Sequence, residues 1–261
     1  MSDLSRRQML LGSAACVALG TLSASRRAQG IGPASKFQIA QLILGNRWNP
    51  HPTALRRLLW EIDKRTSIDV SLEPAPVRLE ARKLHQVPFL YLAGDRSLPL
   101  VPAQEMEVLR RFLTFGGFLL IDSAEGRAGG TFDASVRRLV GEIWPRPAPG
   151  LEPVPRDHVL YKSFYLVEQP VGRVLVAPQL EAVFRDKRAA VVYCQNDLGG
   201  AYARDNYGNW EHECYPGGES QREHAFRLGI NLAMHALCLD YKTDQVHVPF
   251  ILKRRRWKTG P

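Results

Sequence analysis

The stretch Gly116-Gly117-Phe118-Leu119-Leu120-Ile121-Asp122 lies near the middle of the 261-residue chain and decides the fold. Its glycine pair ends a helix, because glycine adopts the left-handed backbone conformation found at helix C-termini. The four apolar residues that follow are typical of a strand buried on both faces. An acidic residue comes directly after that strand. This order of helix, glycine turn, buried strand and polar residue predicts a repeating strand-helix unit.

The chain on the N-terminal side of this stretch repeats the same alternation. Leu55, Leu58, Leu59 and Ile62 have the i, i+3, i+4, i+7 spacing that places side chains on one helix face. Pro102 favours the start of another helix, because proline is tolerated in the first helical turn. We therefore predict strands at residues 37–44, 69–72, 88–93 and 118–121, and helices at 52–65, from 102 onward and around 136–143.

The second half of the chain is less regular. Residues 145–155 are rich in proline and predict an irregular surface segment. Short runs of β-branched and aromatic residues follow, and some of these strands should be antiparallel. The predicted strands cover residues 159–167, 173–177, 180–184 and 189–194.

A long loop and a final helix complete the predicted elements. Ser220 and Glu223 have the spacing of a capping box, which starts a helix. Residues 226–239 of that helix are apolar almost all round and should be deeply packed. The preceding residues, 199–218, are glycine-rich and predict a loop that carries the aromatic residues Tyr202, Tyr207, Trp210 and Tyr215.

Together these elements predict one α/β domain over residues 31–261. With 45% hydrophobic residues the chain can bury a full core, and no linker divides it. Alternating strands and helices favour a flavodoxin-like, three-layer sandwich whose sheet is mainly parallel. Antiparallel strands are expected only in the second half.

The N-terminal stretch Ser5-Arg6-Arg7-Gln8-Met9-Leu10-Leu11 resembles a twin-arginine export signal. The apolar segment that follows is shorter than the ~20 residues needed to span a bilayer, so we expect a cleaved signal over residues 1–30. The resemblance implies that Arg6 and Arg7 bind the twin-arginine (Tat) translocase and that the folded protein reaches the periplasm. The alternative is two ordinary basic residues before another kind of signal or a buried helix.

The formal net charge is +9, and removal of residues 1–30, with four arginines and one aspartate, leaves +6. The densest basic run lies in the C-terminal tail, at residues 253–258. Because exported proteins rarely meet nucleic acid, we do not expect a nucleic-acid partner. The tail is either simply solvated or in contact with anionic lipid or a cell-wall polymer.

Cysteine usage does not indicate a disulfide scaffold, since three cysteines remain beyond residue 30. Cys194 and Cys214 either pair in an oxidising compartment or remain free thiols. Cys238 lies in an apolar helical pattern and is predicted to be a small, buried residue. His212 and Cys214 are possible ligands of a soft metal ion, and the alternative is that they belong to a loop held by hydrogen bonds.

Polar side chains follow the predicted strands at several points, and carboxyl ends of parallel strands share one edge of a sheet. Such residues bind a divalent cation through oxygen ligands, with Asp122 and Asp197 as its candidates, or bind a sugar. The alternative is that each makes a turn or caps a helix. The predicted ligand-binding residues are Asn46, Arg47, Asp95, Asp122, Glu125, Asn196 and Asp197.

Five segments resemble the bacterial family called domain of unknown function 4159. They are residues 116–122, 158–165 (HVLYKSFY), 196–199 (NDLG), 227–232 (RLGINL) and 241–249 (YKTDQVHVP). The resemblance runs from about residue 37 to 252. It implies a fold similar to class I glutamine amidotransferases and an association of some relatives with bacterial membrane proteins, but no established activity.

Amidotransferases of that fold carry a cysteine nucleophile on a sharp, glycine-flanked turn after a strand. Here the corresponding strand leads into Asp122, Ser123 and Glu125 without a cysteine or the strained turn. Two hypotheses follow. We favour a non-catalytic binding module of the cell envelope, whose partner is a polysaccharide or a protein. The alternative is a periplasmic hydrolase, metal-assisted or not, with Asp122, Ser123, Glu125 and Asp197 as candidate catalytic residues.

Overall fold

The computed structural model describes residues 36–80, 84, 87–185 and 188–256, with the side chains of the last helix described as far as Cys238. The predicted signal over residues 1–30 lies outside the described residues, as do the side chains of the basic tail. Among the helices that the structure describes, none combines the length and the apolar character needed to cross a membrane.

A seven-stranded sheet forms the middle layer, in the order β2-β1-β3-β4-β7-β6-β5. The strands β2, β1, β3, β4 and β7 are parallel, and β6 and β5 are antiparallel to their neighbours. The order of the parallel strands is that of flavodoxin-like folds, with β7 in the fifth position. The strands are β1 (Ile39–Leu42), β2 (Ala75–Val77), β3 (Phe89–Gly94), β4 (Phe118–Ser123), β5 (Glu152–Pro153), β6 (Glu181–Arg185) and β7 (Arg188–Cys194).

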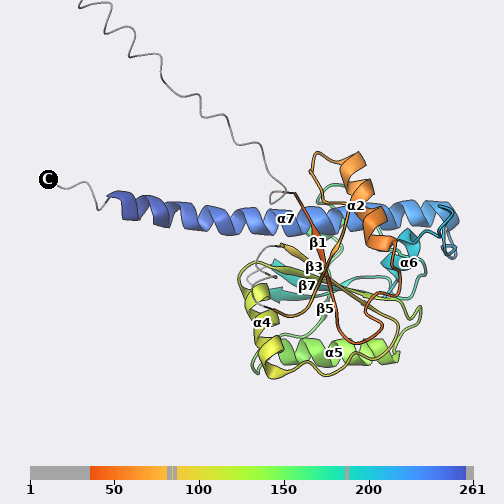
Figure 1. Cartoon of the computed structure of the whole chain (residues 1–261), viewed down its shortest axis with the longest axis horizontal. Coiled ribbons are helices and arrows are strands. Elements are labelled where there is room, and N and C mark those ends of the chain that lie inside the picture. Colours follow the sequence, from red (N-terminus) through yellow and green to blue (C-terminus); the bar gives the residue numbers. More distant parts are fainter. Residues whose placement is uncertain (1–35, 81–83, 85–86, 186–187, 257–261) are drawn as a thin grey trace, which may run out of the picture. The chain divides into compact units, whose positions relative to one another are not determined.

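Helices cover both faces of the sheet, so the predicted three-layer α/β sandwich is confirmed (Figure 1). Helices α4 (Ala103–Thr114) and α5 (Thr131–Ile143) lie on one face. On the other face lie α2 (Ala54–Arg65), α6 (Leu198–Tyr202) and the first part of α7 (Gly218–Arg256).

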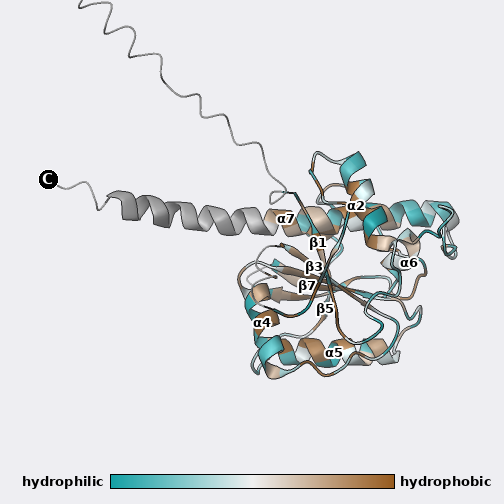
Figure 2. Cartoon of the chain, in the orientation of Figure 1, coloured by the Kyte–Doolittle hydropathy of each residue, from teal (hydrophilic) through white to brown (hydrophobic). Residues whose placement is uncertain are grey.

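Two apolar cores result from this layering, one on each face of the sheet. Alternate residues of the central strands point to opposite faces, so that Leu120 packs toward α2 and α7 while Leu119 and Ile121 pack toward α4 and α5. In Figure 2 the strands are largely brown, and α4 and α5 carry brown and teal residues together, as expected of helices with one buried face.

The predicted strand at residues 69–72 is wrong. Only Val70 forms an isolated bridge, with Phe37, and the edge strand is Ala75–Val77 instead. Pro76 lies within that strand, and proline is accepted at a sheet edge because its missing N–H has no ladder partner to satisfy there.

The predicted strands at residues 159–167 and 173–177 are also wrong, because asparagine side chains bind their backbone in place of a neighbouring strand. Val159–Tyr161 is a short 3-10 helix. Asn231 Oδ1 accepts hydrogen bonds from the backbone N–H groups of Phe164 and Tyr165. Asn196 Oδ1 accepts from those of residues 176 and 177 in the same way. The strands predicted at 180–184 and 189–194 are confirmed.

The start of the final helix differs from the prediction. Helix α7 begins at Gly218, and Glu223 forms ion pairs with Arg65 and Arg227 instead of closing a capping box at Ser220. The deep packing of the helix is confirmed, since its apolar residues from Phe226 to Ala236 are largely buried. Cys238 is exposed, so the prediction that it is buried is wrong.

Candidate functional site

Asp122 is the last but one residue of β4, and its carboxylate is buried at the carboxyl end of the sheet. Its Oδ1 accepts a hydrogen bond from the backbone N–H of Leu198 (2.9 Å). Its Oδ2 accepts from the N–H of Gly199 (2.7 Å) and from the hydroxyl of Tyr91 (2.8 Å). Asp122 therefore ties β4 and β3 to the first turn of α6.

Asp197 immediately precedes α6 and is completely buried. Its backbone is left-handed, with φ 57° and ψ 68°, a conformation that aspartate tolerates better than most residues. Its carboxylate accepts from the N–H of Gly200 and from the guanidinium of Arg173, and lies 3.0 Å from the Nε2 of His51. This carboxylate thus caps α6 and joins two distant loops.

His51 lies in the loop between β1 and α2, and its side chain is only 10% exposed. Nε2 faces Asp197, whereas Nδ1 is buried without a hydrogen-bond partner among the described residues. The ring meets that of His212 edge-on, with centroids 5.1 Å apart. The set of Tyr91, Asp122, His51, Arg173 and Asp197 is called the strand-end cluster below.

The charges of the strand-end cluster oppose and compensate one another. Burial, followed by the negative charge of Asp197, raises the pKa of Asp122 to about 6. Burial also acts to raise the pKa of Asp197, but the bonds from His51 and Arg173 outweigh it and hold that pKa below its usual value. Burial acts to lower the pKa of His51, and the bond to Asp197 overrides this effect, so the pKa of His51 is raised.

Neither Cys194 nor Ser123 lies in an environment that would activate it as a nucleophile. Burial, together with the charge of Asp122, raises the pKa of the Cys194 thiol well above its ordinary value, which disfavours the reactive thiolate. The hydroxyl of Ser123 is buried and accepts a bond from the N–H of Glu125. Cys194 and Cys214 are both free, buried thiols.

Two other predicted site residues are bonded within the protein. The carboxylate of Glu125 accepts from the hydroxyl of Thr131 and the N–H of Asp133, so it holds the first turn of α5. The amide of Asn196 donates to the carbonyls of Pro170 and Ala177 and accepts from two backbone N–H groups. Asn196 therefore fixes the segment before β6.

The remaining predicted residues lie at the surface. Asn46 and Arg47 are exposed in the loop after β1. The guanidinium of Arg47 pairs with the carboxylate of Asp95 at 2.5 Å, and Arg96 lies 3.3 Å from that carboxylate. Arg47 and Asp95 thus join the loops after β1 and β3 at the point where the strand order reverses.

The arrangement does not fit the predicted cation. The oxygens of Asp122 and Asp197 already accept hydrogen bonds, so a metal ion would have to displace them. Within the described part of the chain, no three His, Cys, Asp or Glu side chains are grouped to hold a metal ion.

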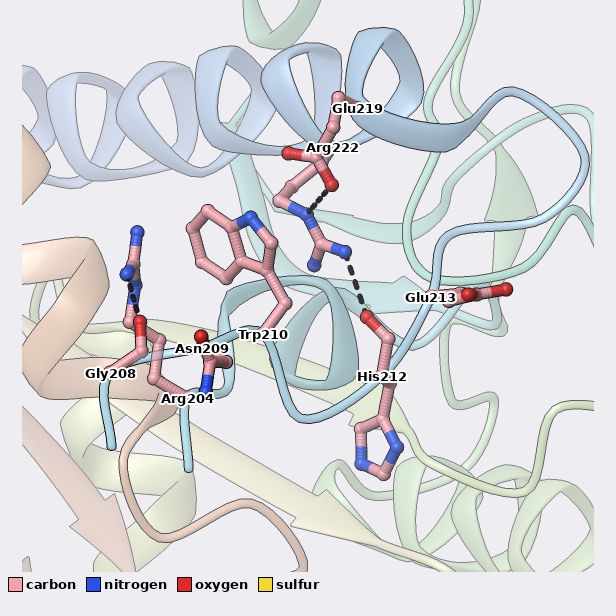
Figure 3. A pocket seen from close by; sticks show the side chains of 8 residues that line it. All are labelled: Arg204, Gly208, Asn209, Trp210, His212, Glu213, Glu219 and Arg222. Carbon is pink, nitrogen blue, oxygen red and sulfur yellow. Dashed lines mark hydrogen bonds and ion pairs between the residues drawn. The ribbon is translucent and has the colours of Figure 1, made fainter. Parts of the chain in front are cut away.

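An open cavity of about 450 Å³ lies beside the segment that joins α6 to α7 (Figure 3). The loop predicted at residues 199–218 is shorter in the structure, because residues 198–202 form α6, where Tyr202 is buried, and α7 begins at Gly218. The cavity is called the loop pocket below. Its lining residues are Arg204, Gly208, Asn209, Trp210, His212, Glu213, Glu219 and Arg222.

Trp210 is the centre of the loop pocket. In Figure 3 its indole lies between the side chains of Arg204 and Arg222. The guanidinium carbons of these arginines lie 3.8 and 4.2 Å from the ring centroid, which is the distance of cation–π contacts. Tyr207 and Tyr215, on the same segment, are 91% and 75% exposed.

Sequence reasoning missed His51, Tyr91 and Arg173 in the strand-end cluster, and Arg204 and Arg222 in the loop pocket. His51 follows β1 just as Asn46 does, and its place after a strand was the available signal. Tyr91 and Arg173 carried no such signal, since one lies inside an apolar strand and the other in a segment predicted to be a strand.

The matched family model covers residues 38–237, which span the sheet, the strand-end cluster and the loop pocket. The description of that family is a domain of unknown function, DUF4159. No curated protein matches the chain. The family model covers well over half of the sequence, and the chain therefore belongs to the DUF4159 family.

Proposed function

We propose that this protein is an exported, non-catalytic module of the bacterial cell envelope that binds a carbohydrate or cell-wall fragment through the loop pocket. One observation carries the proposal. The oxygens of the buried carboxylates in the strand-end cluster accept hydrogen bonds from within the protein. The loop pocket, in contrast, is open and lined by aromatic and polar side chains. The carboxylates of the strand-end cluster are therefore occupied within the protein, whereas the side chains of the loop pocket are accessible to a ligand.

The size and lining of the loop pocket support a small polar ligand. A volume of about 450 Å³ is within the usual range for small-molecule sites. Tyr207 and Tyr215 do not line the pocket, but they are exposed on the segment that carries it and offer ring faces to the C–H groups of a sugar and hydroxyls to its oxygens. Neither side chain is part of the core, so both are accessible to a ligand.

The export half of the proposal is supported by Arg6 and Arg7 within residues 5–11 and by the apolar segment that follows. We propose that the Tat translocase carries the folded chain to the periplasm. The basic residues 253–258 support contact with an anionic membrane surface, and an envelope protein is the alternative partner.

Co-sedimentation of the protein lacking residues 1–30 with insoluble cell-wall material tests the binding function. We expect most of the protein in the pellet, and a several-fold loss when Tyr207 and Tyr215 are both replaced by alanine. Phe115→Ala is the matched control, because Phe115 is 70% exposed at the end of α4. Failure of the protein to sediment would contradict wall binding. Equal losses in both variants would contradict the segment that carries the loop pocket as the binding surface.

His51 supports a second candidate function, that of a hydrolase. A histidine oriented by a buried carboxylate, with a free ring nitrogen, is the arrangement of a general base. Incubation with the same wall material would then release soluble fragments, and His51→Ala would abolish the release while His224→Ala, at an exposed position, would not. We expect no release from any of the three proteins.

A further inference from the structure

We propose that the loop pocket is specific for acidic carbohydrate, with the ligand's carboxylate bound by Arg204 and its sugar ring against the hairpin that carries Tyr207. This proposal rests on the proposed function and names the ligand class of the same site. It follows from an arginine in the pocket that has no direct ion pair among the described residues, and from the geometry of the hairpin.

Three guanidinium groups surround the indole of Trp210. Those of Arg204 and Arg222 lie 3.8 and 4.2 Å from the ring centroid, and that of Arg57 lies at 5.6 Å. Each is attracted by the negative face of the ring, but like charges at such separations repel one another. Nearby anions reduce this repulsion.

Two of the three charges are balanced within the protein. Arg57 is paired with the carboxylate of Glu61. Arg222 is paired with Glu219 at 3.0 Å, and it donates further hydrogen bonds to the carbonyls of Ala201 and His212. Figure 3 shows the contacts of Arg222 with Glu219 and His212 as dashed lines. The guanidinium groups of these two arginines are therefore occupied by contacts within the protein.

Arg204 has no direct ion pair within the described part of the chain. Its side chain donates to the carbonyl of Gly208, and among the described residues no carboxylate lies within 4.0 Å of it. Its Nε is buried without a partner in the same part of the chain. Burial, followed by repulsion from Arg57, lowers the pKa of Arg204, and the more distant carboxylates of Glu61 and Glu219 offset this only in part. A ligand carboxylate would supply a direct counter-charge and accept from the guanidinium.

The hairpin beside Arg204 is shaped for a sugar. Arg204 and Trp210 pair as an antiparallel bridge, and the turn between them is held by the carboxylate of Asp205, which accepts from the N–H groups of Tyr207 and Asn209. Tyr207 stands exposed on this turn. At Gly208, with φ +85°, no atom lies within 4 Å of where a side chain would project. The open space at Gly208 leaves room for a sugar ring to approach the hairpin.

The other polar groups of the pocket favour a carbohydrate over a simple inorganic anion. The amide of Asn209 and the carboxylate of Glu213 line the same pocket and suit sugar hydroxyls. Figure 3 shows the side chain of Glu213 directed away from Trp210, so it does not neutralise the arginines around the ring. A cavity of about 450 Å³ has room for one or two sugar rings.

Calorimetric titration of the protein lacking residues 1–30 tests this inference, with digalacturonate as the acidic probe, maltose as the neutral probe and inorganic phosphate as the bare anion. We expect digalacturonate to bind at least tenfold more tightly than either of the others. Arg204→Gln should weaken that binding at least tenfold. Arg56→Gln should leave it unchanged, because Arg56 is 66% exposed and pairs with Glu73.

Each other outcome overturns the inference in a distinct way. Equal binding of maltose removes the specificity for acid but leaves a sugar-binding module. Equal binding of phosphate replaces the sugar site by a simple anion site. Binding of none of the three contradicts the inference, while wall co-sedimentation still tests the proposed function separately. Should Arg204→Gln not fold, Tyr207→Ala provides the test, since its exposed side chain can be removed safely and its loss should weaken binding several-fold.

Discussion

The Nε2 of His51 lies 3.0 Å from the Oδ1 of Asp197, although 146 positions separate the two residues in the sequence. The contact joins the loop after β1 to the start of α6, at the carboxyl ends of the parallel strands. Because the ring is nearly buried and the carboxylate is fully buried, the pair is shielded from solvent. Its charge state should therefore influence the stability of the fold.

His51→Gln should change the dependence of stability on pH. The pKa of His51 is raised above 6.5 in the folded protein, so its contribution is fully present below pH 6.5 and is lost as the pH rises through the folded value. As the pH rises from about 6.5 through the folded pKa of His51, the wild-type protein should lose more stability than the variant. Thermal unfolding at several pH values measures this. Parallel curves for the two proteins would contradict the pairing.

Asp197→Asn should destabilise the protein by about 3–5 kcal/mol at neutral pH, because it leaves the charge of Arg173 without its buried partner. Asparagine tolerates the left-handed backbone, so the loss reports the charge and not strain. Urea unfolding measures the change. Asp69→Asn is the control, since Asp69 pairs with Lys36 at the surface and should change the stability by less than about 1 kcal/mol.

Asn196→Ala and Asn46→Ala separate two asparagines with the same sequence signal. The amide of Asn196 is buried and makes four hydrogen bonds to backbone groups, so we expect a loss of about 2–4 kcal/mol. Asn46 is exposed, and its replacement should be nearly neutral. Equal effects in chemical denaturation would show that Asn196 does not fix the segment before β6.

The fold was largely predictable because its central strands are local apolar runs. Residues 89–93, 118–121 and 189–194 are buried on both faces, and their sequences reflect this directly. The wrong strands at residues 159–167 and 173–177 have a common physical cause. Residues 164–165 and 176–177 have strand-like composition, but Asn231 and Asn196 bind their N–H groups. A side chain from a distant segment thus replaced a sheet neighbour.

The position of the strand-end cluster in the fold could be predicted from the sequence, but most of the residues that form it could not. Asp122 lies at the end of β4 and Asp197 follows β7, and the parallel sheet brings both to the start of α6. Their partners His51 and Arg173 come from other loops, and the sequence gives no spacing that links them. The loop pocket depends on Arg204 and Arg222 meeting at Trp210, which only the tertiary structure determines.

Gly199→Ala should disturb the strand-end cluster directly. A methyl group at Gly199 would lie 3.0 Å from the hydroxyl of Tyr91 and 3.1 Å from the ring of His51, so these groups must move apart. We expect a loss of about 1–3 kcal/mol in the free energy of unfolding. Gly141→Ala is the matched control, because it lies in α5 with open space around it and should stabilise by about 0.5–1 kcal/mol. Two destabilised variants, or two neutral ones, would contradict this close packing.

The central claim is that the strand-end cluster holds the fold together while the loop pocket binds the ligand. Hydrogen–deuterium exchange of the protein lacking residues 1–30, with and without soluble wall-glycan fragments, tests it most directly. The account predicts that the fragments slow exchange in residues 204–222 and leave residues 43–51, 94–98 and 122–126 unchanged. Slower exchange in the loops after β1, β3 and β4, with none in residues 204–222, would place the ligand at the strand ends and contradict the account.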